Sequence, residues 1–96
     1  MLLSVIIPTR NRKESLYQTL AALFRQKAAI HEVIVIDSSD VPIDASELRA
    51  EFDFGALCLL RAGASVCAQR NQGIRKATGD YILVLDDDIV VDDHYI

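Results

Sequence analysis

The sequence predicts an α/β fold: a doubly wound, mostly parallel sheet of about four strands with helices on both faces. Short apolar runs rich in β-branched residues alternate along the chain with segments of helical periodicity. Such alternation is typical of right-handed βαβ units, whose sheets are covered on both faces. The chain has 96 residues, 51% of them hydrophobic and 25% charged, so we expect one globular domain over residues 1–96.

The first strand and the first helix are the most regular of the predicted elements. Leu2–Ile7 is a continuous apolar run that ends at a proline, as expected for a strand buried on both faces. Asn11 and Glu14 have the spacing of a capping box, and apolar residues follow at helical intervals. This pattern predicts a helix over about Lys13–Gln26, with Asn11 as its cap.

The middle of the chain contains two further strands and a short helix. Val33–Ile36 is the second buried strand; it ends at Asp37, and the polar, turn-forming segment Ser38–Ile43 follows. A weaker helix is expected at Ala45–Glu51. The apolar run Leu57–Leu60 is the third predicted strand.

The last third of the chain contains a helix, a fourth strand and the start of another helix. Ser65 is a candidate cap for a helix over Val66–Thr78, which Gly79 closes. Tyr81–Leu85 is the fourth apolar run, and Asp92 has the position of a cap for one more helix.

Composition and charge exclude several classes of protein. The net charge of −4 argues against nucleic-acid binding. No apolar run is long enough for a spanning helix or a signal peptide, so we expect a cytoplasmic protein. The alternative is that the full-length protein is peripheral at the inner face of the membrane. Cys58 and Cys67 lack metal-ligand spacing and are expected to be reduced core thiols, with His31 and His94 at the surface.

An acidic triplet follows the fourth apolar run directly. In an extended chain Asp86 and Asp88 point the same way, while Asp87 faces elsewhere. Mg²⁺ or Mn²⁺ would relieve the repulsion between these carboxylates, and two carboxylates would leave coordination positions open for substrate phosphates. The alternative is a solvated acidic turn that caps the following helix. The buried strand before the triplet favours the metal site.

Two other polar residues are candidates for ligand binding. Asp37 follows the second strand at the carboxyl edge, where sheets of this kind bind ligands, and it either caps the next turn or accepts hydrogen bonds from a base or ribose. Arg70 lies midway between Val66 and Ile74, on a helix face that we expect to point inward, with Asp37 or a nucleotide as its partner. The alternative is an arginine whose guanidinium extends into water. Gly73 is expected to allow close packing of this helix.

Three segments, in this order, carry a family resemblance: SVIIPTRNR at Ser4–Arg12, EVIVIDSSD at Glu32–Asp40 and AQRNQGIRKATGDYILVLDDDI at Ala68–Ile89. They resemble family 2 glycosyltransferases, which have the Rossmann-like GT-A fold. The resemblance covers nearly the whole chain. It is specific because the R-N-x-G, A-x-G-D-Y and D-x-D elements occur together at the family's spacing.

The resemblance implies a role for each matching residue. Thr9 occupies the position near the nucleotide base, Asp37 that of the acid holding uracil or an equivalent base, and Arg70 that of the arginine approaching the nucleotide. The outer positions of the D-x-D, which contact the ribose and the metal bridging the diphosphate, correspond to Asp86 and Asp88. Family members differ in which carboxylate touches the metal, so Asp87 is included among the nucleotide-sugar-binding residues.

The implied activity is that of a hexosyltransferase, with Mn²⁺ or Mg²⁺ as cofactor. A sugar would pass from a nucleoside-diphosphate sugar, with a UDP-sugar as the expected donor, to a hydroxyl of a saccharide or lipid-linked acceptor, with inversion. The family's catalytic base and acceptor site lie beyond position 96. We therefore expect residues 1–96 to be the nucleotide-sugar-binding part of a truncated catalytic domain, without efficient transfer and prone to self-association through exposed apolar surface.

Two features depart from the family pattern, and other functions remain open. Arg10 stands where an aromatic residue is common, and Ser38-Ser39-Asp40 stands where a D-G-S turn is common. A nucleotidyltransferase would need a glycine-rich basic loop, which PTRNRKE lacks. A receiver-like phosphoacceptor module would need an acidic pair where this chain has Thr9 and Arg10. A non-catalytic nucleotide-binding or partner-binding module is the remaining alternative.

Overall fold

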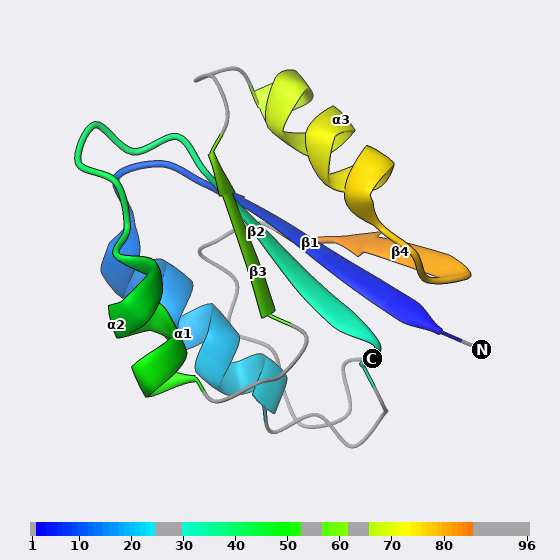
Figure 1. Cartoon of the computed structure of the whole chain (residues 1–96), viewed down its shortest axis with the longest axis horizontal. Coiled ribbons are helices and arrows are strands. Elements are labelled where there is room, and N and C mark those ends of the chain that lie inside the picture. The colour runs from blue at the N-terminus through cyan, green and yellow to red at the C-terminus, as the bar shows by residue number, and fades with distance from the viewer. Residues whose placement is uncertain (1, 25–29, 53–56, 62–65, 86–96) are drawn as a thin grey trace.

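The computed structural model describes residues 2–24, 30–52, 57–61 and 66–85. These residues form four parallel strands in the order β3-β2-β1-β4 and three helices (Figure 1). The elements are, in chain order, β1 (Leu3–Thr9), α1 (Lys13–Phe24), β2 (Glu32–Asp37), α2 (Ala45–Glu51), β3 (Leu57–Arg61), α3 (Val66–Lys76) and β4 (Tyr81–Val84).

Helices cover both faces of the sheet, with α1 and α2 on one face and α3 on the other (Figure 1). Successive residues of a strand point to opposite faces. Val5 and Ile7 of β1 therefore pack with Leu16 and Leu48 of the helices on one face. Ile6, between them in sequence, belongs to a second cluster on the α3 face. The expected doubly wound α/β fold is confirmed.

The strand order separates this fold from a receiver domain. A receiver has the order 2-1-3-4-5, whereas the described strands follow the 3-2-1-4 order of dinucleotide-binding folds. In both cases ligands bind outside the carboxyl ends of the strands, at the point where the order reverses. Here that point lies between β1 and β4.

The cap expected for α1 was wrong. The helix begins at Lys13, and the Arg12 carbonyl accepts from the Leu16 amide. Asn11 has a left-handed backbone, with φ at 56°, and its side chain pairs with Asp40 instead of with the helix. A small polar residue such as asparagine tolerates this conformation, which redirects the chain between β1 and α1.

The expected short helix Ala45–Glu51 is confirmed, and it has a cap that the sequence pattern did not single out. Both the Ser46 and Glu47 amides donate to the side chain of Asp44. Such capping satisfies amides that have no partner within the helix.

Polar contacts at the amino edge of the sheet explain the Thr78-Gly79 pair of the A-x-G-D-Y element. Glu32 accepts hydrogen bonds from Ser4 Oγ at 2.6 Å and from the Thr78 amide at 2.6 Å, and the Gly79 amide donates to Ser4 Oγ. A Cβ atom on Gly79 would lie 2.5 Å from Ser4 Oγ and 2.8 Å from the Leu2 carbonyl oxygen. Only glycine fits at position 79. Thr78 and Gly79 therefore have a structural role in the connection from α3 to β4, at the amino edge of the sheet and away from the carboxyl edge.

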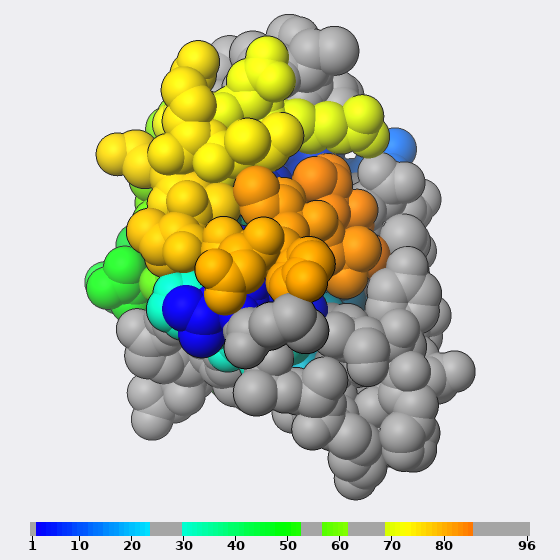
Figure 2. All heavy atoms as spheres, turned by 90° about the vertical axis from the view of Figure 1, so that its right-hand side faces the viewer, coloured from blue at the N-terminus to red at the C-terminus, as the bar shows by residue number. Residues whose placement is uncertain are grey.

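The far edge of the sheet is formed by β4, which lies beside α3 at the surface and has two exposed side chains (Figure 2). Tyr81 and Ile82 have 55% and 44% of their surface exposed. On the opposite edge strand, Cys58 is half-buried and packs against the core cluster on the α3 face. His31, before β2, is exposed, as expected; His94 and the side chain of Cys67 lie outside the described part of the chain. No helix in the described part of the chain is long and apolar enough to cross a membrane.

Candidate functional site at the carboxyl edge of the sheet

The carboxyl ends of three neighbouring strands form one row of residues. Thr9 ends β1 and pairs in register with Asp37, which ends β2. Asp37 in turn pairs with Arg61, which ends β3. Parallel strands place their carboxyl ends at one edge, where doubly wound folds bind their ligands. The register thus places Thr9 beside Asp37, the two residues that the family resemblance assigns to the nucleotide base, and it adds Arg61 to them.

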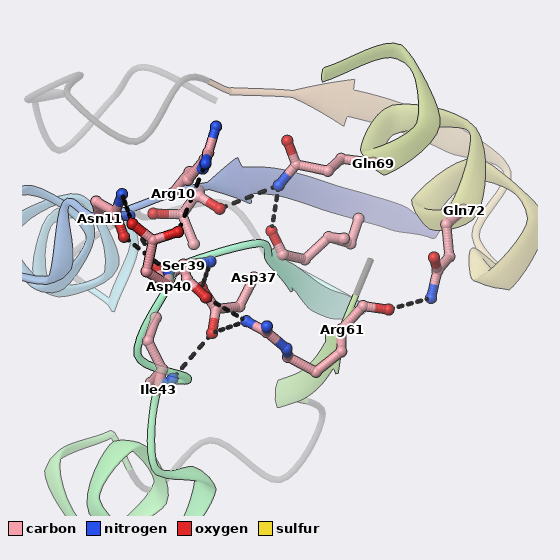
Figure 3. A network of polar contacts seen from close by, with 11 residues as sticks. Arg10, Asn11, Asp37, Ser39, Asp40, Ile43, Arg61, Gln69 and Gln72 are labelled. Carbon is pink, nitrogen blue, oxygen red and sulfur yellow. Dashed lines mark hydrogen bonds and ion pairs between the residues drawn. The ribbon is translucent and has the colours of Figure 1, made fainter. Parts of the chain in front are cut away.

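The carboxylate of Asp37 is the centre of this row (Figure 3). Its Oδ1 accepts from the Ser39 amide at 2.9 Å, and its Oδ2 accepts from the Ile43 amide at 2.9 Å and from Arg61 Nη1 at 3.0 Å. Burial alone would raise the pKa of Asp37, but these hydrogen bonds outweigh burial and hold the pKa below its ordinary value. Asp37 is therefore an ionised, internally paired carboxylate at neutral pH.

The two alternatives for Asp37 were a turn residue and a ligand-binding residue. The turn role is present, since the side chain bonds the amide two residues further on and that of Ile43. The carboxylate has no exposed surface in this structure. Asp37 was one of the two partners considered for Arg70, but its ion pair is formed with Arg61.

The loop after β2 is tied to the loop after β1. The Asn11 amide donates to Ser39 Oγ at 2.8 Å, and the Asp40 amide donates to Asn11 Oδ1 at 2.9 Å. Arg10, the residue that departs from the family pattern, forms an exposed ion pair with Asp40 at 3.5 Å. The other departure, Ser39 and Asp40, thus supplies the partners that connect the two loops (Figure 3).

Gln69 of α3 fixes the helix against the ends of β1 and β2. Its Nε2 donates to the Thr9 carbonyl at 3.0 Å and to the Ile36 carbonyl at 2.8 Å (Figure 3). Only 2% of the Gln69 surface is exposed. Thr9 is also 2% exposed, and its carbonyl accepts a further hydrogen bond from the Ser38 amide.

The inward orientation expected for Arg70 was wrong. Arg70 is exposed, as is Ile74, and the face that meets the sheet contains Gln69 and Gly73. A Cβ atom on Gly73 would lie 2.5 Å from Ile6 Cγ2, so the missing side chain is what lets this face approach β1. The expectation that Gly73 allows close packing is confirmed, and it also decides the rotation of the helix. Binding of a nucleotide by Arg70 remains a prediction.

Arg61 is the site residue that the sequence reading missed. It is the charged last residue of an apolar strand, a position equivalent to that of Asp37 in β2. Its Nη1 donates to Asp37 Oδ2 and to the Ser39 carbonyl, each at 3.0 Å. Gln72 of α3 donates to the Arg61 carbonyl. A charge at the end of a strand is the signal that could have identified Arg61, but the predicted third strand ends at Leu60, one residue earlier.

The expected metal ligands Asp86 and Asp88, together with Asp87, lie outside the described residues. The chain reaches them through Leu85, whose amide donates to the Ile6 carbonyl of β1 at 2.9 Å. Within residues 2–24, 30–52, 57–61 and 66–85 no group of three acidic, histidine or cysteine side chains could hold a metal ion.

Comparison with known proteins gives the chain its family. Residues 4–96 match the model of glycosyl transferase family 2. Chondroitin synthase of Escherichia coli is 37% identical over 94 residues, which cover 91% of this chain and 13% of that protein.

Solved structures agree on the fold. The mannosyltransferase PcManGT from Pyrobaculum calidifontis, in complex with GDP-Man and Mn²⁺, is 26% identical with a TM-score of 0.73, over 90% of this chain and 27% of that one. TarS 1–349 of S. aureus has a TM-score of 0.75 at 22% identity, over 97% of this chain and 29% of that one. The chain spans about a third or less of the length of the curated relatives it matches. With the family model matching nearly every residue, the chain belongs to glycosyl transferase family 2.

Proposed function

We propose that the protein transfers a sugar from a nucleoside-diphosphate sugar to an acceptor hydroxyl, and that these 96 residues supply the nucleotide-sugar side of the site. One observation carries the proposal. The carboxyl ends of β1, β2 and β3 align Thr9, Asp37 and Arg61 in a row, beside the point where the strand order reverses. Family membership supports the reaction, and the GDP-Man complex of PcManGT supports the class of donor.

The proposed arrangement follows the order of the strands. The acidic triplet continues the chain from β4, the neighbour of β1, so the diphosphate would lie at the reversal between these two strands. Ribose and base would then extend over the ends of β2 and β3, where the residues of the row are found. Arg70 is exposed on α3, and because a guanidinium is suited to binding anionic groups, we include it among the nucleotide-sugar-binding residues.

A divalent cation, Mn²⁺ or Mg²⁺, is part of the proposal. The carboxylate oxygens of Asp86 and Asp88 are the ligands that these ions prefer, and the Mn²⁺ in the PcManGT complex supports the same choice. When bound, the ion would neutralise charge on the departing nucleoside diphosphate. The residues of this chain would hold the donor and orient its anomeric carbon toward the acceptor.

We further propose inversion at the anomeric carbon and assign no catalytic base among the 96 residues. A base deprotonates the acceptor hydroxyl in such a transfer. The relatives are at least three times as long as the part that this chain matches, which supports a base and an acceptor site supplied by other residues. The 96-residue chain alone would then bind the donor without transferring its sugar efficiently.

Calorimetric titration of UDP-glucose and GDP-mannose into the protein, with and without Mn²⁺, tests the proposal. We expect binding of at least one donor that Mn²⁺ strengthens about tenfold or more, and loss of this gain in Asp88→Asn, because a cation site loses a charged oxygen ligand. Glu51→Gln, at the exposed end of α2, removes one acidic charge away from the proposed site and should leave the gain intact. Donor binding that Mn²⁺ does not affect would contradict the metal, and the absence of donor binding would contradict the function.

A further inference from the structure

We propose that Arg61 reads the base of the bound nucleotide and favours bases that present carbonyl oxygens, uracil and guanine, over those that present amino groups in their place, cytosine and adenine. This inference rests on the proposed function. In this proposal the base is recognised by the guanidinium of Arg61 and not by the buried carboxylate of Asp37, with which Arg61 pairs.

Asp37 is not accessible to a base. Its side chain has no exposed surface, and its carboxylate already accepts from two amides and from Arg61. An ionised carboxylate only accepts hydrogen bonds, so a base N–H would have to displace one of these donors. Removing a donor from a buried charge is unfavourable.

Arg61, in contrast, is both held in place and accessible to a ligand. Half of its side chain is exposed, at 51%. In the described part of the chain both hydrogen bonds of its guanidinium use Nη1, one to Asp37 and one to the Ser39 carbonyl. A guanidinium has five N–H donors in a rigid plane and no acceptor. The donors on the other nitrogens remain for a ligand, in an orientation that the buried carboxylate fixes (Figure 3).

Arg61 also lies at the far end of the sheet from the proposed phosphate site. It ends β3, three strands away from β4, from which the acidic triplet continues. Three spacings between neighbouring strands are about 14 Å. A nucleotide whose phosphates lie near the end of β4 would therefore extend toward β3 with its base, the end farthest from the phosphates.

The chemistry of the guanidinium then sets the preference. Its donors match the O4 atom of uracil or the O6 atom of guanine. The amino groups at the same positions of cytosine and adenine would instead place donors against donors. A mismatch of this kind at a charged group changes affinity by about 10-fold to 100-fold.

Titration of UDP, CDP, GDP and ADP in the presence of Mn²⁺ measures this preference. For the unmodified protein we expect UDP to bind about 10-fold or more tightly than CDP, and GDP more tightly than ADP. Arg61→Met keeps most of the alkyl stem and removes every donor, so both ratios should fall to within about twofold. Arg75→Gln, in the last turn of α3 toward the amino edge, removes one positive charge from an exposed position and should change neither ratio.

A ratio of affinities separates base recognition from a general loss of binding or stability. If Arg61→Met fails to fold, Arg61→Lys decides, because lysine keeps the charge without the planar donors and should lower both ratios several-fold. Equal binding of UDP and CDP by the unmodified protein, or unchanged ratios in the Arg61 variants, would overturn the inference and leave the proposed function standing. Failure of all four nucleotides to bind would overturn both.

Discussion

Replacement of Gln69 by methionine tests how α3 is held against the sheet. Methionine has nearly the shape of glutamine but cannot donate to the Thr9 and Ile36 carbonyls, which Gln69 Nε2 reaches at 3.0 and 2.8 Å. Because Gln69 is only 2% exposed, water is excluded from replacing these bonds. Both hydrogen bonds are lost, although the Thr9 carbonyl keeps the Ser38 amide as a donor. The free energy of unfolding should fall by about 1–3 kcal/mol.

For a domain of this size such a loss lowers the melting temperature by roughly 5–20 °C. Thermal and urea unfolding followed by circular dichroism measures both quantities. Asn71→Leu is the matched control, since it also replaces an amide by an apolar group of similar shape, but at an exposed position of the same helix. Its effect should stay within about 0.5 kcal/mol. If the two variants lose the same stability, the role assigned to Gln69 is wrong.

Three further predictions concern the amino edge of the sheet and the exposed edge strand. Gly79→Ala should cost about 1–3 kcal/mol in urea unfolding, because the new Cβ would lie 2.5 Å from Ser4 Oγ and 2.9 Å from the Ser4 amide nitrogen; an unchanged midpoint would contradict this packing. For Glu32, burial would raise the pKa, but hydrogen bonds from Ser4 and its other partners outweigh burial and lower the pKa below the ordinary value of 4.5. The stability due to Glu32 is therefore complete above that value and lost as the pH falls through the lowered pKa, so Glu32→Gln should flatten the acid branch of a stability–pH curve; a curve parallel to that of the unmodified protein would refute this. Tyr81 and Ile82 expose apolar surface on an edge strand, so light scattering should detect concentration-dependent association that Ile82→Lys reduces, whereas a monodisperse monomer at high concentration would count against it.

At the candidate site the sequence predicts one partner of the central ion pair and not the other. Asp37 was identified because a single acid at the end of a buried apolar run is conspicuous. Its partner Arg61 could not be identified in the same way. The two residues meet because β2 and β3 are neighbours in the sheet, and no spacing along the chain indicates that register. Either Arg61 or Arg70 has the charge needed to pair with Asp37, and only the structure shows that Arg61 forms the ion pair.

The face of α3 that points toward the sheet is likewise set by contacts with other elements and not by the pattern within the helix. Adjacent positions on a helix differ by about 100°, so Gln69 and Arg70 cannot both face the sheet. The apolar residue Ile74 suggested the face that contains Arg70. A glycine that permits close approach and a glutamine that satisfies two carbonyls outweigh one isoleucine, and these contributions exist only once the sheet is present.

The sequence by itself determined the order and nature of the elements and which polar residues follow the strands at the carboxyl edge, where we propose the site. Strand and helix are encoded in local periodicities of two and 3.6 residues, and a parallel arrangement brings the strand ends together without further information. Only the tertiary structure decided which side chains satisfy one another at that edge. Hydrogen bonds and close contacts of this kind join Asp37 to Arg61 and Gln69 to Thr9 across 24 and 60 residues of chain, and local pattern does not contain them.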